Sequence, residues 1–226
     1  MVTIKKALLI FDLDDTLVHS RIDFQTLGQW VREQVKSRKL TELSDEELST
    51  MSVSQMLHLV EAFDRRRGTG HAPELWRKVE EAEMAGAMRA TVEEGAQAVL
   101  QQLQEEGYLL TILTNNSRRV AETVLTRFSL LPYIDLVLTR DEVKVLKPDP
   151  TGLLMLKEKY KDRAARMFYI GDIWIDGAAA NQAGIPFIGF NCSDPRNIRM
   201  VDNVSNLAEL ARLVEEICSA GKGGLS

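Results

Sequence analysis

The chain has 226 residues, of which 45% are apolar, so it can bury a sizeable core in one domain with an insertion or in two domains. Its net charge of -5 argues against the basic face that general binding to nucleic acid or to an anionic membrane requires. Cys192 and Cys218 show no paired spacing, which argues against a disulfide framework or a zinc site. No apolar run approaches the roughly 18 residues of a membrane helix, so we expect a soluble, cytoplasmic protein.

The first predicted element is a short buried strand over residues 7–11, which runs directly into Asp12, Asp14 and Asp15. Alternate residues of an extended chain point the same way, so Asp12 and Asp14 can reach one spot while Asp15 points elsewhere. Two neighbouring carboxylates repel each other, and a cation or a proton must relieve that repulsion. The stretch also fits an acidic loop before a helix, with Asp15 or Thr16 as the cap of that helix. By itself it leaves both interpretations open.

Residues 18–90 show apolar positions at helical spacing and no convincing strand. Asp23 is the predicted cap of the first helix, Ser44 and Glu47 match a capping box, and Pro73 stands in the first turn of a later helix. We therefore predict an all-helical insertion.

From residue 91 onward, predicted helices and strands alternate. The strands are predicted at 108–113, 134–139, 167–170 and 185–190, and the helices from Val92 to a stop at Gly107, from Ser117, from the Asp149-Pro150 pair, over 176–183, and after a cap at Ser205. Five buried strands separated by helices predict an α/β fold with a doubly wound parallel sheet. Residues 1–17 and 91–226 would form this Rossmann-like core, 18–90 the helical insertion, and 221–226 a flexible tail.

Ligands of such sheets bind at the carboxyl ends of the strands, where this chain places mostly polar residues. These residues are Asp12 and Asp14 after the first strand, Thr114, Asn115 and Asn116 after the second, Lys147 after the third, and Asp172 and Asp176 after the fourth. Asp12, Asp14 and Asp172 offer hard oxygen ligands without histidine or cysteine, which favours Mg²⁺ over zinc. Lys147 and the Thr114 hydroxyl can hold an anionic group such as a phosphate against such a metal. Asn116 and Ser117 fit better as caps of the next helix.

Four motifs follow one another in the chain. They are Asp12-x-Asp14-x-Thr16, Thr114 at the end of a strand, Lys147-Pro148-Asp149-Pro150, and Gly171-Asp172-x-x-x-Asp176. This set resembles the motifs of the haloacid dehalogenase (HAD) superfamily and spans residues 7 to about 190. The insertion resembles the helical cap of that superfamily. The Lys-Pro-Asp-Pro form is similar to the branch that contains phosphoglycolate phosphatases and beta-phosphoglucomutases.

The resemblance implies a role for each motif residue. Asp12 would be the nucleophile that forms an aspartyl-phosphate, with its other oxygen on magnesium. Asp14 would be the general acid and then the base, and its backbone carbonyl would bind the metal. The remaining roles are phosphoryl binding by Thr114 and the backbone amide of Asn115, charge neutralisation by Lys147, metal binding by Asp172 with Asp176 beside it, and ordering of the first loop by Thr16.

The implied activity is a Mg²⁺-dependent phosphatase acting on a small phosphate ester such as phosphoglycolate or a sugar phosphate. Asp14 argues against dehalogenation and phosphonate hydrolysis, since those enzymes lack a second acid at this position. A phosphomutase of the beta-phosphoglucomutase type and a non-catalytic binding protein of the same fold remain as alternatives. We expect a monomer or a homodimer, with hinges of the cap over residues 17–23 and 87–93.

Overall fold

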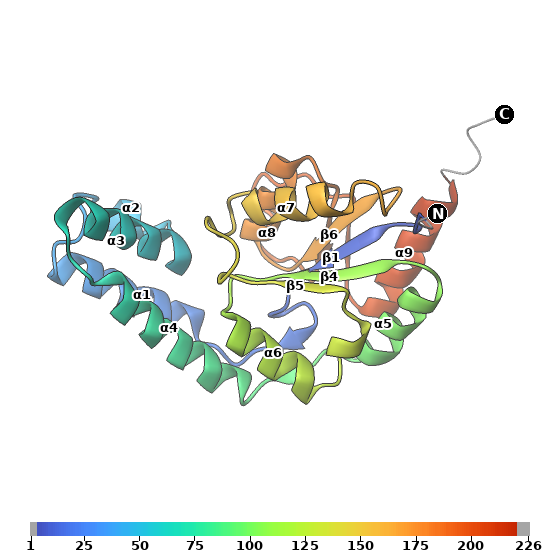
Figure 1. Ribbon diagram of the computed structural model, residues 1–226, viewed down its shortest axis with the longest axis horizontal. Coiled ribbons are helices and arrows are strands. Elements are labelled where there is room, and N and C mark those ends of the chain that lie inside the picture. The colour runs from blue at the N-terminus through green and yellow to red at the C-terminus, as the bar shows by residue number, and fades with distance from the viewer. Residues whose placement is uncertain (1–3, 221–226) are drawn as a thin grey trace. The chain divides into compact units, whose positions relative to one another are not determined.

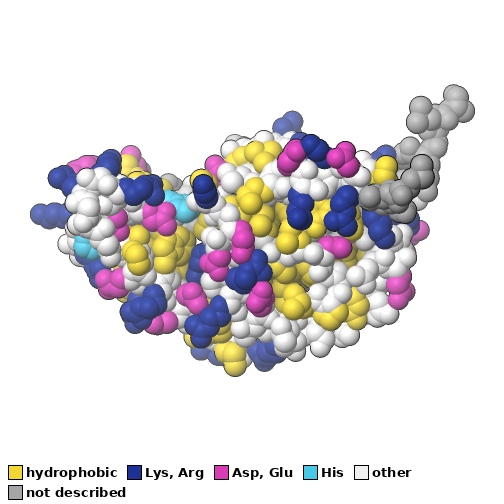
Figure 2. All heavy atoms as spheres, viewed as in Figure 1, with side chains coloured by type: hydrophobic (Ala, Val, Ile, Leu, Met, Phe, Trp, Pro, Cys, Tyr) yellow, Lys and Arg dark blue, Asp and Glu magenta, His cyan; other side chains and the backbone are white. Residues whose placement is uncertain are grey.

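The computed structural model describes residues 4–220, so the predicted tail over 221–226 lies outside the described residues. The chain divides into two compact units. One joins the residues up to His19 with those from Thr91 onward, and the other is Ser20–Ala90. No helix within residues 4–220 is long and apolar enough to cross a membrane. On the face drawn in Figure 2, basic and acidic side chains are interspersed.

The first unit is built on a six-stranded sheet in the order β5-β4-β1-β6-β7-β8 (Figure 1). Its strands are β1 (Leu8–Phe11), β4 (Leu109–Leu113), β5 (Leu136–Leu138), β6 (Met167–Gly171), β7 (Phe187–Phe190) and β8 (Asp202–Val204). Every neighbouring pair is parallel. The chain adds strands outward from β1 to one side and then to the other, which confirms the predicted doubly wound sheet. The carboxyl end of β1 therefore lies at the point where the strand order reverses.

Helices cover both faces of this sheet, which explains why all four residues of β1 are fully buried. The helices are α5 (Ala96–Glu105), α6 (Arg118–Arg127), α7 (Thr151–Tyr160), α8 (Trp174–Ala183) and α9 (Leu207–Ala220), with a short 3₁₀ turn at Leu131–Tyr133. In Figure 1, α7 and α8 lie above the sheet while α5 and α6 lie below it. Helix α9 packs against α5 and β8.

At the short elements of this unit, one prediction was wrong and one strand was missed. Val92 is not helical: it belongs to β3 (Thr91–Val92), which pairs antiparallel with β2 (Val18–His19), and α5 begins only at Ala96. Strand β8 was not predicted, because two of its three residues are exposed and the segment lacks an apolar run. Such short segments are held by pairing with neighbouring strands, and their own periodicity is too brief to detect.

The cap of the last helix was also placed one residue too early. The Asn206 side chain accepts the backbone N–H of Glu209 at 2.9 Å, which makes Asn206 the capping residue. Ser205 instead donates its backbone N–H to the Glu209 carboxylate at 2.7 Å. Adjacent Ser and Asn are both good caps, so composition alone does not choose between them.

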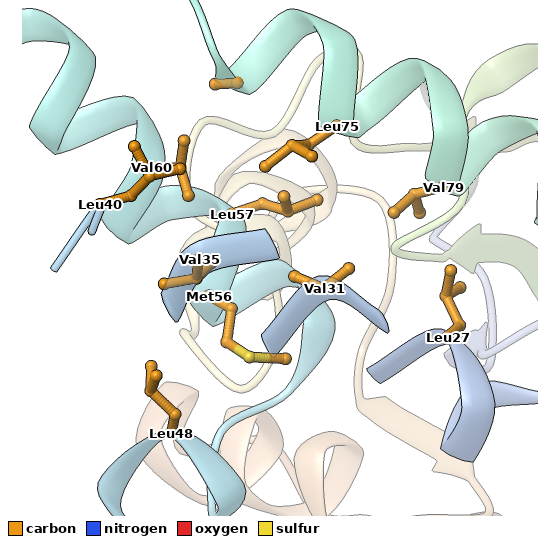
Figure 3. Close-up of a cluster of buried hydrophobic side chains, with 11 residues drawn as sticks. Leu27, Val31, Val35, Leu40, Leu48, Met56, Leu57, Val60, Leu75 and Val79 are labelled. Carbon is orange, nitrogen blue, oxygen red and sulfur yellow. The ribbon is translucent and has the colours of Figure 1, made fainter. Parts of the chain in front are cut away.

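The second unit is helical in the residues described. It contains α1 (Phe24–Ser37), α2 (Asp45–Ser49), α3 (Val53–Arg67) and α4 (Ala72–Ala87). The predicted cap at Asp23 and the capping box of Ser44 and Glu47 are confirmed. A separate apolar core holds these helices together (Figure 3); it includes Leu27, Val31, Val35, Leu40, Leu48, Met56, Leu57, Val60, Leu75 and Val79. Trp30 and Trp76 pack against it, as predicted from their helical spacing.

The joint between α3 and α4 is organised by one buried carboxylate. Gly68 ends α3 in the left-handed conformation with φ 68°. Asp64 then accepts the Thr69 hydroxyl at 2.6 Å and the backbone N–H of Ala72 at 2.7 Å. One side chain thus binds the residues after one helix and at the start of the next.

Candidate active site

Asp12 stands directly after β1 and is only 7% exposed. Its backbone N–H donates to the Ile170 carbonyl at 2.8 Å, which continues the parallel pairing of β1 with β6 by one residue. Its side chain accepts the Lys147 ammonium at 2.6 Å. Strand pairing therefore fixes the backbone of Asp12, and a buried ion pair fixes its carboxylate.

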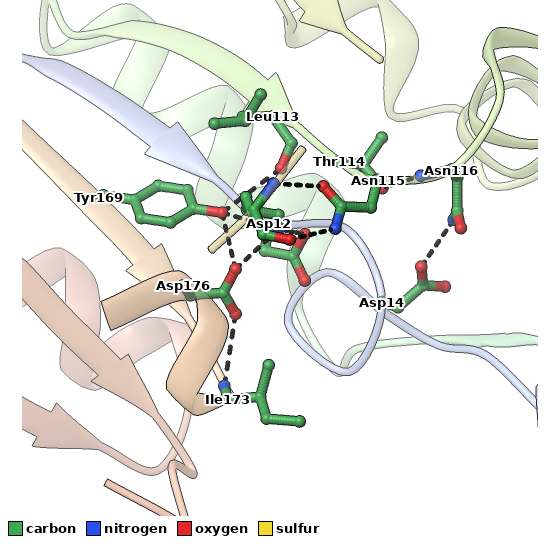
Figure 4. Close-up of polar contacts among 10 residues, drawn as sticks. Asp12, Asp14, Leu113, Thr114, Asn115, Asn116, Tyr169, Ile173 and Asp176 are labelled. Carbon is green, nitrogen blue, oxygen red and sulfur yellow. Dashed lines mark hydrogen bonds and ion pairs between the residues drawn. The ribbon is translucent and has the colours of Figure 1, made fainter. Parts of the chain in front are cut away.

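Lys147 is 4% exposed and is the centre of the polar contacts. Its ammonium donates to Asp12 Oδ1 at 2.6 Å, to Asp176 Oδ1 at 2.7 Å and to the Tyr169 hydroxyl at 2.9 Å. Burial lowers the pKa of Lys147, but the carboxylates of Asp12 and Asp176 raise it further, so the net shift is upward and the ammonium stays charged. Figure 4 shows Asp12, Tyr169 and Asp176 turned toward one another.

Three carboxylates form a cluster at the same edge of the sheet. One oxygen each of Asp12, Asp172 and Asp176 lies within 4.8 Å of the others. Gly171, the last residue of β6, makes room for this cluster, because a Cβ there would lie 2.6 Å from Asp176 Cγ. The Asp172-x-x-x-Asp176 spacing carries the chain from the strand end into the first turn of α8, so both acids face Asp12.

The cluster holds more negative charge than Lys147 balances. Burial raises the pKa of Asp12 to about 8; Lys147 opposes this shift, while Asp176 and Asp14 add to it. Burial also raises the pKa of Asp172 to about 9, with Asp176 and Asp12 contributing. A divalent cation among these oxygens would remove the repulsion, so the donor set fits a hard metal ion.

The cluster contains Asp176 together with Asp12 and Asp172, whereas the resemblance implied Asp14 as a ligand through its backbone carbonyl, with Asp176 beside the metal. The Asp14 carboxylate accepts the Asn116 side-chain N–H at 2.6 Å (Figure 4). A turn follows Asp14, in which Asp15 has a φ of 53° and donates its backbone N–H to the Val18 carbonyl. The predicted role of the Asp14 backbone carbonyl in metal binding stays a prediction.

Asn116 was predicted to cap a helix, and this prediction was wrong. Ser117 caps α6 by accepting the backbone N–H of Val120. Asn116 is 3% exposed and uses its side chain to hold Asp14. The sequence could have indicated this role, because Asn116 follows β4 closely and so lies at the same edge of the sheet as Thr114.

Thr114 and Asn115 lie at the end of β4, beside the centre of the sheet. Thr114 donates its backbone N–H to the Leu138 carbonyl at 3.0 Å, and its hydroxyl oxygen accepts the Asn116 N–H at 3.1 Å. A hydroxyl accepts a hydrogen bond through a lone pair and keeps its own proton, so the Thr114 O–H can still donate to a ligand. The Asn115 side chain pairs with the backbone of Lys147.

Two further residues complete the description of the site. Thr16 is 1% exposed, and its hydroxyl has no hydrogen-bond partner among residues 4–220; its predicted ordering of the loop stays a prediction. Tyr169 was not predicted as a site residue. Its flanking residues Phe168 and Ile170 make it look like one more apolar position of a buried strand.

Known proteins resemble this chain over most of its length. The model of the haloacid dehalogenase-like hydrolase family matches residues 9–190. A phosphoglycolate phosphatase of Cereibacter sphaeroides is 27% identical over 192 residues, which cover 80% of this chain and 84% of that protein.

Two solved structures resemble the fold. One is a Bacillus subtilis protein assigned to the HAD hydrolases and bound to magnesium, with a TM-score of 0.59, 18% identity and coverage of 94% of this chain and 99% of that one. The other is a HAD phosphatase from Thermococcus onnurineus, with a TM-score of 0.60, 20% identity and coverage of 92% and 97%. The match of the family model, which includes all four predicted motifs, shows that this chain belongs to the haloacid dehalogenase-like hydrolases.

Proposed function

We propose that this protein is a Mg²⁺-dependent phosphatase that hydrolyses a small phosphorylated metabolite through an aspartyl-phosphate on Asp12. The observation that carries the proposal is the convergence of Asp12, the Lys147 ammonium and a cluster of carboxylates at the carboxyl edge of the sheet. The similarity to a phosphoglycolate phosphatase over 80% of the chain supports it and makes phosphoglycolate, with sugar phosphates, the leading substrate class.

Asp12, Asp172 and Asp176 are the side chains that would hold the cation, with the backbone carbonyl of Asp14 as a further predicted ligand. The raised pKa values of Asp12 and Asp172 support this assignment, since carboxylates in excess of Lys147 need a counter-charge. The related Bacillus subtilis structure was solved with magnesium. Bound there, the ion would neutralise the carboxylates and favour the approach of a phosphate dianion.

The side chains support a two-step displacement. An Asp12 oxygen attacks phosphorus as the bond to the ester oxygen breaks, and the departing oxygen takes a proton from Asp14. Water then attacks the same phosphorus and gives a proton to Asp14, and inorganic phosphate leaves as the bond to Asp12 breaks. Thr114 and the backbone N–H of Asn115 would bind phosphoryl oxygens, while Lys147 offsets the charge at Asp12.

The direct test is phosphate release from a panel of phosphorylated metabolites, with magnesium and then with EDTA. We expect turnover with magnesium, none with EDTA, and recovery when magnesium is restored. Turnover that persists without any divalent metal would contradict the proposed site. Isomerisation of a sugar phosphate without net phosphate release would identify a phosphomutase, and no reaction with any ester would favour a binding protein.

Two variants test the assigned roles. Asp12→Asn should abolish turnover while folding is retained. Asp14→Asn should release about one equivalent of nitrophenol from p-nitrophenyl phosphate and then stall, because this leaving group needs no acid but hydrolysis of the intermediate needs a base. Asp162→Asn, on an exposed residue, is the matched control.

The predicted role of the helical insertion as a mobile cap stays a proposal. It is supported by the separate core of the unit Ser20–Ala90 and by the position of β2 and β3, where the chain leaves the first unit and returns to it. Hydrogen exchange of residues 17–23 and 87–93, compared with and without beryllium fluoride, would test it. Exchange that a bound phosphate analogue leaves unchanged would argue against hinges in these segments.

A further inference from the structure

Tyr169 is fully buried in β6 and lies between a cation and an anion. Its hydroxyl accepts a hydrogen bond from the Lys147 ammonium at 2.9 Å and donates one to Asp176 Oδ1 at 2.8 Å. Lys147 also donates directly to Asp176 Oδ1 at 2.7 Å. The three groups therefore form a closed ring of hydrogen bonds, visible in part in Figure 4.

This ring restricts the direction of the Lys147 ammonium. A lysine has three N–H donors, and its partners here include Asp12, Asp176 and the Tyr169 hydroxyl. The phenol oxygen is carried by a strand in the middle of the sheet, so it is a rigid acceptor. It holds the end of a long, flexible side chain at one place.

The ring also controls Asp176. Oxygen Oδ1 of Asp176 takes both the ammonium and the phenol proton, while Oδ2 accepts the Ile173 backbone N–H at 3.3 Å. Without the phenol, Lys147 would be the one remaining side chain in the ring to satisfy Oδ1. The ammonium would then shift between Asp12 and Asp176, which compete for it at nearly equal distances.

We propose that Tyr169 is a positioning residue for the reaction at Asp12. It keeps the Lys147 ammonium on the nucleophile and the Asp176 carboxylate in its place in the cluster, without contact to the substrate. The inference rests on the proposed phosphatase function. It assigns to this strand residue a role that its apolar surroundings conceal.

The kinetic test is Tyr169→Phe, which removes the hydroxyl oxygen and keeps the aromatic side chain. We expect kcat to fall at least about tenfold, because the lost hydroxyl hydrogen-bonds to two charged groups, with KM changed less than about twofold. Tyr160→Phe, at another buried tyrosine on α7, should keep the wild-type kcat. An unchanged kcat in Tyr169→Phe, or a rise in KM alone, would overturn the inference.

A second readout is independent of activity. With lysine labelled by ¹⁵N at Nζ, the buried Lys147 ammonium should give an NMR signal with slowly exchanging protons. The signal should shift and exchange faster in Tyr169→Phe but not in Tyr160→Phe, and an identical signal in both would overturn the inference. If the wild-type enzyme releases no phosphate, the proposed function fails and the positioning role fails with it; if it does and Tyr169→Phe is fully active, only the positioning role fails.

Discussion

The side-chain amide of Asn115 forms a pair of hydrogen bonds with the backbone of Lys147, 32 positions further along the chain. Its Nδ2 donates to the Lys147 carbonyl at 3.0 Å, and its Oδ1 accepts the Lys147 N–H at 3.1 Å. The amide side chain thus satisfies both the N–H and the carbonyl of Lys147, as a neighbouring strand would. It ties the loop that carries Lys147 to the end of β4, next to the strand that carries Asp12.

Removing this pair should loosen Lys147. For Asn115→Ala we expect a loss of about 1–3 kcal/mol in the free energy of unfolding, because two backbone groups lose their partners. We also expect kcat to fall, since the Lys147 ammonium must stay on Asp12. Denaturant unfolding and phosphate release measure the two effects. Asn197→Ala, on an exposed loop residue, is the control, and equal behaviour of the two variants would contradict the role of the pair.

Gly171→Ala tests the packing beneath the carboxylate cluster. The added Cβ would lie 2.6 Å from both Cγ and Oδ2 of Asp176, so the carboxylate must move. We expect the magnesium concentration for half-maximal activity to rise about 10- to 100-fold, as for other groups that orient metal ligands. Titration calorimetry with magnesium provides a reading without substrate. Gly70→Ala is the control, because a Cβ there meets nothing within 4 Å.

Asn116→Ala should release the Asp14 carboxylate, which Asn116 holds at 2.6 Å. We expect kcat to fall about 10- to 100-fold with KM little changed, because Asp14 acts in both proton transfers of the proposed reaction. Steady-state kinetics with an alkyl phosphate measures this. The melting temperature should stay near that of the wild type. A rise in KM alone would instead indicate that Asn116 binds substrate.

Asp64 makes the helical unit sensitive to acid. Burial raises the pKa of Asp64, but the hydrogen bonds from Thr69 and the backbone of Ala72 outweigh it, so the net shift is below the ordinary 3.8. A pKa depressed in the folded state contributes stability that is present above pH 3.8 and is lost as the pH falls through the folded value.

Asp64→Asn should therefore destabilise the protein by about 1–3 kcal/mol at neutral pH. The difference from the wild type should shrink only as the pH falls below 3.8 and through the lower folded-state pKa, where the wild-type carboxyl takes up its proton. Urea unfolding followed at several pH values measures it. Glu33→Gln, on an exposed residue of α1, should follow the wild type throughout. A difference that does not depend on pH would contradict the linkage.

The sheet and the helical insertion were predictable because their signals are local. The strands β1, β4, β6 and β7 are predominantly apolar segments of four or five residues, and such segments are long enough to detect. Strands β2, β3 and β8 have two or three residues each, and their pairing with neighbours decides their conformation. The α9 cap was misplaced for a related reason, since two adjacent residues have equal propensity to cap.

The motif residues by themselves determined which chemistry the chain can support. Carboxylates, a hydroxyl and an amine follow the ends of successive strands, and a parallel sheet brings those ends to one edge. Tertiary structure decided how these groups are paired. It placed the Asp14 carboxylate on Asn116, brought Asp176 into the cluster with Asp12, and set Tyr169 between Lys147 and Asp176. Such contacts join residues far apart in the chain at distances of a few ångströms, and residue spacing carries no information on that scale.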